Sequence, residues 1–156
     1  MENPGSAEIW TELNGDIQIA ALMETFGDFH DGCIREIHVV TGHYVDQKLS
    51  MHVDSRTTVH MLVQRQFRNP SAIELRFEEV VAMKVCPPPP NHDWIMFDAA
   101  CFLREGILYW ADDTQWTPDS ADETTWVAAR RASWRDASAW LGPDLRYRTG
   151  TTGSQA

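Results

Sequence analysis

Residues 57–64, Thr-Thr-Val-His-Met-Leu-Val-Gln, decide the fold class, because Val59, Met61 and Val63 alternate with Thr58, His60 and Gln64. The same alternation recurs at Leu49, Met51 and Val53 and at Ile73, Leu75 and Phe77. Strict alternation gives a strand one buried and one solvent-facing side, which is typical of an antiparallel sheet. We therefore expect these apolar residues to face the core and their polar neighbours, including Glu74 and Glu78, to face water.

Further runs extend this pattern along the chain. The expected strands cover residues 33–41, 47–54, 57–68, 72–85, 94–103, 106–112 and 124–135. Residues 9–13 are a short strand or an entry segment, and the helical spacing of Trp126, Arg130 and Trp134 leaves a helix as the alternative over residues 124–135. Short turns between such runs favour hairpins and a meander. A helix is predicted over Asp16–Phe26, with Asp16 as its cap and Gly27 as its stop. The predicted fold is α+β, a mainly antiparallel sheet curled toward a sandwich or half-barrel, with this one N-terminal helix. We expect residues 1–148 to form a single domain and residues 149–156 a flexible tail.

Composition narrows the classes of partner. The chain has 156 residues and a net charge of −10, from 23 acidic and 13 basic side chains. Such a surface repels phosphate backbones and anionic membranes and favours a basic protein partner. Three scattered cysteines, no apolar run long enough to span a bilayer and no signal peptide favour a reducing cytoplasm.

Candidate chemical groups do not form a recognisable catalytic motif. His30-Asp31 lies at the helix-to-strand corner, where we expect Phe29, His30 and Asp31 to form a structural turn, with the Asp31 carboxylate accepting backbone hydrogen bonds. A catalytic His–Asp pair, with Cys33 as a neighbouring nucleophile, is the sharper alternative. His38, His52 and His60 occur in successive predicted strands, but their spacing matches no metal motif. We expect no metal and no cofactor.

An acidic loop at residues 111–123 is the candidate partner surface. It combines five acids with one tryptophan and carries no base. Trp116 would be the buried anchor of an interface, and the carboxylates would steer a basic partner. The alternative is a solvated loop whose tryptophan packs into the core. The predicted partner-binding residues are Asp112, Asp113, Trp116, Asp119, Asp122 and Glu123.

Landmarks in the first half of the chain form a recognisable pattern. They are Trp10 to Gly15, Phe26-Gly27, Phe29-His30-Asp31, Ile34, Ile37 and the strand Ile73–Phe77. This pattern resembles small bacterial immunity proteins of polymorphic toxin systems, and the same turn also occurs in uncharacterised bacterial families. The resemblance implies a protein that binds and neutralises a cognate toxin without catalysis.

The leading hypothesis is therefore a non-enzymatic, cytoplasmic protein-binding module of the immunity type. Two alternatives stay open. One is a small-molecule-binding domain with a pocket between sheet and helix. The other is a hydrolase-like enzyme that uses His30 and Asp31.

Overall fold

The fold is α+β and mainly antiparallel sheet, which confirms the predicted class. The computed structural model describes residues 9–92, 95–121 and 123–148, so the tail 149–156 lies outside the described residues. The elements are β1 (Thr11–Glu12), α1 (Asp16–Thr25), the 3₁₀ turn η1 (Gly27–Phe29), β2 (Gly32–Thr41), β3 (Tyr44–Val45), β4 (Met51–His52), β5 (Thr57–Arg65), β6 (Ala72–Lys84), β7 (Ala100–Arg104), β8 (Ile107–Ala111), β9 (Trp126–Asp136) and the 3₁₀ turn η2 (Ser138–Trp140).

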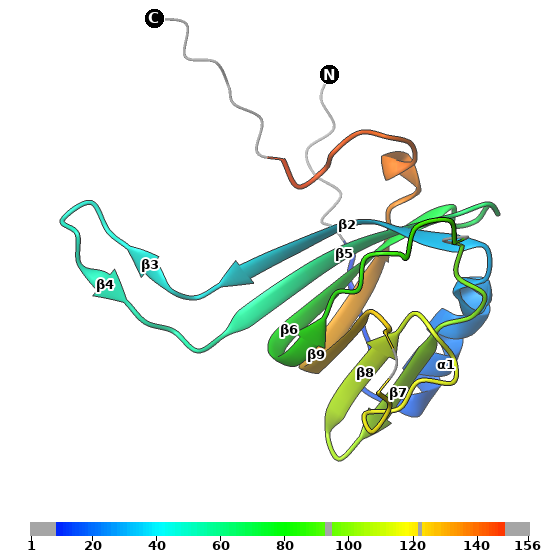
Figure 1. Cartoon of the computed structure of the whole chain (residues 1–156), viewed down its shortest axis with the longest axis horizontal. Coiled ribbons are helices and arrows are strands. Elements are labelled where there is room, and N and C mark those ends of the chain that lie inside the picture. Colours follow the sequence, from blue (N-terminus) through cyan, green and yellow to red (C-terminus); the bar gives the residue numbers. More distant parts are fainter. Residues whose placement is uncertain (1–8, 93–94, 122, 149–156) are drawn as a thin grey trace, which may run out of the picture.

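Two antiparallel meanders make up the main sheet. The strand order is β2-β5-β6-β9-β8-β7, so β2, β5 and β6 form one meander and β7, β8 and β9 form the other. The pairing of β6 with β9 joins them over most of both strands. β8 pairs with the first part of β9, residues 126–129, and β1 pairs with Ser133 and Trp134 near the end of that strand. Figure 1 shows the resulting sheet with α1 beside β7.

The sheet curls, because its two ends meet. An isolated antiparallel bridge links Gly32, at the start of β2, with Met96, in the segment that precedes β7. The concave side encloses the main core, which contains Leu22, Phe26 and Trp110. Phe29 packs edge-on against Phe26 and Trp110, at centroid distances of 5.0 Å and 5.6 Å. This curvature agrees with the predicted half-barrel.

The predicted strand over residues 47–54 is wrong. Residues 46–50 form a turn, and β4 is limited to Met51–His52. Leu49, Met51 and Val53 are 86%, 65% and 77% exposed, so they face solvent rather than the core. Their alternation indicated an extended strand with one apolar side, but this part of the chain projects beyond the strands that could bury it.

The convex side of the sheet carries a buried charged cluster. The alternation in the sequence predicts instead that the polar residues on this side face water. Glu74 is 2% exposed. His60 Nδ1 donates to its Oε1 at 2.8 Å, and Arg135 donates to its Oε2 through Nε at 3.0 Å and Nη2 at 2.7 Å. Trp10 covers this cluster from one end, with its ring 4.8 Å from the Arg135 guanidinium carbon, and Tyr147 lies beside His60.

The protonation of Glu74 follows from these contacts. Burial raises the pKa of Glu74, but hydrogen bonds from His60 and Arg135 outweigh burial, so its pKa lies below the usual range. A carboxylate whose folded-state pKa is lowered stabilises the fold above its unfolded-state pKa. This contribution is lost as the pH falls through the folded-state value.

We expect Glu74→Gln to lower the free energy of unfolding at pH 7 by about 3 kcal/mol, because it leaves the Arg135 charge buried without its anionic partner. Urea denaturation measures this change. The control is Glu78→Gln on the same strand and side, where the side chain is 29% exposed and the change should stay below about 1 kcal/mol. Equal stability of the two variants would contradict the assigned role of the cluster.

Candidate functional site

A β-hairpin arm, residues 42–56, projects from the sheet where β2 and β5 extend past the other strands (Figure 1). It consists of β3, β4, the turn 46–50 and the segments that connect them to the sheet. Tyr44 pairs with His52 and Val45 with Met51. The rings of Tyr44 and His52 stack with centroids 4.5 Å apart and planes inclined by 4°. The two strands of the arm are therefore held in a defined register.

Asp46 fixes the turn at the tip of the arm. Its Oδ1 accepts hydrogen bonds from the backbone N–H groups of Lys48 at 2.8 Å and Ser50 at 3.0 Å. Its Oδ2 lies 2.8 Å from His52 Nε2, and this hydrogen bond is the main reason why the pKa of Asp46 is lowered. The Asp46 carboxylate thus links Lys48 and Ser50 of the turn to His52 of β4.

Leu49 occupies a backbone conformation that disfavours leucine. Its φ is +64°, in the left-handed region where glycine and asparagine are the residues of least strain. Leu49 is also the most exposed of the large apolar residues of the arm, at 86%, so little packing compensates for the strain. Four further apolar residues of the arm are more than half exposed: Tyr44, Val45, Met51 and Val53. The tip therefore presents a cluster of apolar side chains on an ordered support.

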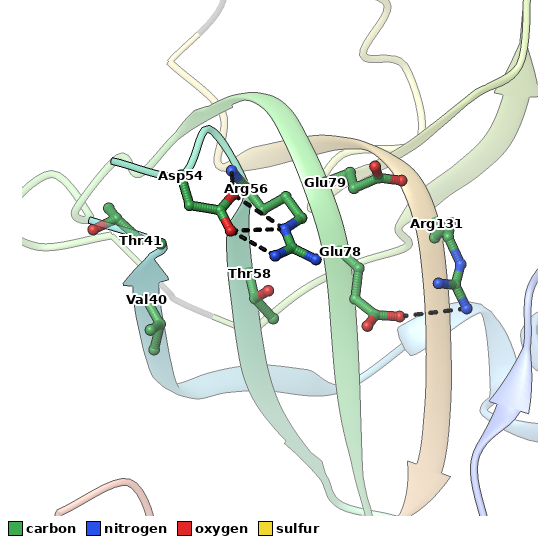
Figure 2. A pocket seen from close by; sticks show the side chains of 9 residues that line it. Val40, Thr41, Asp54, Arg56, Thr58, Glu78, Glu79 and Arg131 are labelled. Atoms are coloured by element: carbon green, nitrogen blue, oxygen red, sulfur yellow. Dashed lines mark hydrogen bonds and ion pairs between the residues drawn. The ribbon is translucent and has the colours of Figure 1, made fainter. Parts of the chain in front are cut away.

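Ion pairs brace the base of the arm (Figure 2). A hollow of about 400 Å³ lies here between Thr41, Arg56 and Glu79. Arg56 Nη2 donates to Asp54 Oδ2 at 2.5 Å, and hydrogen bonds from Arg56 lower the pKa of Asp54 to about 2. A Cβ at Gly42 would lie 2.6 Å from Asp54 Cβ, so only glycine permits this approach. Asp54 and Arg56 therefore compensate each other's charge, and Arg131 lies 3.9 Å from Glu78 Oε2 on the neighbouring strands, which suits a brace.

Only part of the acidic loop is exposed to solvent. Trp116 is 3% exposed and stacks on Trp126 with a centroid distance of 5.1 Å. Its ring is already buried in the free protein, so it cannot serve as the exposed anchor of an interface, and the core-packing alternative describes its position. Asp119 and Glu123 have side chains that are 86% and 84% exposed.

Asp113 is half-buried, and its Oδ1 accepts a hydrogen bond from the Gln115 backbone at 2.8 Å. Asp122 lies outside the described residues. Asp112 differs from its exposed neighbours, because burial raises its pKa to about 6. The carboxylates of Asp119 and Glu123 are therefore exposed, whereas the carboxylate of Asp112 is partly desolvated.

Phe29, His30 and Asp31 form a turn, but the Asp31 carboxylate does not cap it. Among the described residues, this carboxylate contacts only His30 Nε2, at 3.7 Å. The φ angles of Phe29 and Asp31 are +65° and +56°. Aspartate tolerates this left-handed conformation better than most residues, which explains its presence here. His30 Nδ1 lies 2.6 Å from the Phe97 carbonyl oxygen and must donate to it, so this nitrogen is used structurally.

The histidines do not converge on one point. His38 and His60 pair across β2 and β5, with ring centroids 6.5 Å apart, whereas His52 is bound to Asp46 in the arm. Within the described ranges, no group of three or more His, Cys, Asp or Glu side chains is placed to hold a metal ion. The same ranges contain no helix with the length and hydrophobicity needed to cross a bilayer.

A hollow of about 350 Å³ does lie between the helix and the sheet, where Met23 of α1 faces β7. A more apolar hollow of the same volume lies elsewhere, between β2 and the segment after β6.

Comparisons of the chain with protein-family models, with curated proteins and with solved structures gave no match.

We expect Leu49→Asn to leave the free energy of unfolding unchanged or to raise it by up to about 1 kcal/mol, because asparagine relieves the backbone strain and little packing is lost. Leu49→Val is the control. Its branched side chain is still less suited to a positive φ, so it should lower stability by about 1 kcal/mol. Chemical denaturation distinguishes them. An asparagine variant that is clearly less stable than wild type would mean that Leu49 supports the fold.

We expect Asp112→Asn to stabilise the protein at pH 7 by roughly 1–2 kcal/mol, because the folded-state pKa of about 6 exceeds the unfolded value of 3.8. Because the folded-state pKa is the higher one, the free energy of unfolding of the wild type falls as the pH rises from about 4 to 6. The Asp112→Asn variant should lack the share of this fall that comes from Asp112. Asp113→Asn, which changes the neighbouring charge, should keep the decline. If the free energies of unfolding of wild type and Asp112→Asn change with pH in parallel, the raised pKa of Asp112 is contradicted.

Proposed function

We propose that this chain is a non-enzymatic protein-binding module, and that the arm is its contact element. The observation that carries this proposal is Leu49, an apolar side chain held at the tip in a strained conformation and 86% exposed. Strained residues that the rest of the structure holds in place cluster at functional sites. The hydrogen bonds of Asp46 hold this one in place, so the strain is maintained without any benefit to the core.

The geometry of the arm suits a concave partner surface. A narrow projection can enter a cleft that a flat sheet cannot reach, as long loops of some binding proteins do. Apolar side chains at the tip would be desolvated on entry, and an arm ordered before binding loses little conformational entropy.

Charge supports a basic partner. The net charge of −10 and the exposed carboxylates of Asp119 and Glu123 favour association with a basic protein by raising the encounter rate. Taken together with the resemblance of the first half of the chain, these properties lead us to propose an immunity protein whose arm blocks a basic toxin. His30 contributes no support for the hydrolase alternative, since one ring nitrogen is used on the Phe97 carbonyl.

The test uses the wild-type protein as bait in its source organism, followed by affinity measurements with the purified partner. We expect a basic partner whose binding weakens with added salt. Leu49→Asn should weaken binding about 30-fold or more, the effect of losing a contact worth about 2 kcal/mol.

Ile17→Asn is the matched control, because Ile17 on α1 is 81% exposed and lies outside the arm. It should bind within about twofold of wild type. The proposal fails if Leu49→Asn binds as tightly as wild type, or if both variants lose affinity equally.

A further inference from the structure

An apolar cavity of about 350 Å³ opens between β2 and the segment that follows β6. Its apolar wall comes from Ile34, Ile37, Val85, Pro88 and Met96, and Asp112 lies at its edge. The volume falls at the lower end of the range of small-molecule sites, which are typically apolar with a few polar groups. Asp112 is the one charged side chain among the described residues that line it.

The polar groups of Cys86 and Thr125 in this cavity already have hydrogen-bond partners. The Cys86 backbone N–H donates to Thr125 Oγ1 at 2.9 Å. The Cys86 thiol lies 3.5 Å from both Glu123 Oε2 and the Thr124 carbonyl oxygen. The Asp112 carboxylate accepts a backbone hydrogen bond from Thr125 but forms no ion pair with a cation of the described residues, so its charge can pair with a ligand.

The surroundings of Asp112 are acidic. A second hollow of about 410 Å³ shares Met96 and Asp112 with the apolar cavity and adds Asp98, Asp113 and Glu123. Among these acids, Glu123 lies 3.7 Å from Lys84 Nζ. Negative charges along one rim lower the energy of a cation there and repel an anion.

We propose that this cavity binds a primary ammonium ion on an unbranched aliphatic stem, with the stem against Ile34, Ile37 and Met96 and the ammonium group on the Asp112 carboxylate. The stem gains free energy by leaving water, and the ammonium group supplies the positive charge that the partly buried carboxylate lacks. Either a free aliphatic amine or a lysine side chain of a protein can supply this chemistry. The proposal is independent of the arm.

The experiment is an NMR titration of the full chain with n-hexylammonium chloride, monitored at the Met96 methyl group and the Thr125 amide. We expect saturable shifts at both, and binding at least about tenfold tighter than that of 1-hexanol, which has the same stem without the charge. Hexanoate should not bind detectably. Nα-acetyl-lysine amide distinguishes the sources: equal binding points to a lysine side chain, and binding of hexylammonium alone points to a free amine.

Two variants locate the site. Asp112→Asn should weaken hexylammonium binding at least about tenfold, whereas Asp16→Asn on α1, with the same change in net charge, should bind within about twofold of wild type. Ile37→Trp should abolish binding by filling the cavity, and circular dichroism verifies that each variant is folded. The proposal is overturned if hexanol binds as tightly as hexylammonium, if the two aspartate variants behave alike, or if shifts are absent at Met96 and Thr125.

Discussion

The pairing of β6 with β9 is the constraint on which the rest of the structure depends. It joins two three-stranded meanders, each of which would leave one side unburied without the other. Joined, they bury Phe77 and Ala132 on the concave side and hold Glu74 beside Arg135 on the convex side. The same long pairing fixes β5, which pairs with β6, and so gives the arm a rigid base.

Periodicity predicted the sheet because its physical basis is local. Val59, Met61 and Val63 alternate and are fully buried, and the residues predicted as a strand around Trp126 do form β9. The order of the strands depends on which distant segments pair, and no local pattern contains that information. The bridge between Gly32 and Met96, which brings together the two ends of the sheet, is an example.

The errors of the sequence interpretation have a common physical origin, because alternation identifies an apolar side but not what covers it. Met51 shows the pattern of a buried residue and is exposed, since no other element of the described residues covers the tip of the arm. Glu74 shows the pattern of an exposed residue and is buried, since Trp10 and Tyr147 cover that side of the sheet. Asp46, followed by Gln47 and Lys48, was the available signal for a turn, because aspartate commonly caps turn N–H groups. Trp116 shows that an aromatic residue in an acidic loop is not sufficient to indicate a binding surface.

The arm must be ordered before any partner binds, since its strain and exposure have functional meaning only then. Backbone ¹⁵N relaxation of the free protein tests this most directly. We expect order parameters near 0.85 through residues 44–52, equal to those of β5 and β6. Values below about 0.6 at Lys48, Leu49 and Ser50 would show a flexible tip and contradict it.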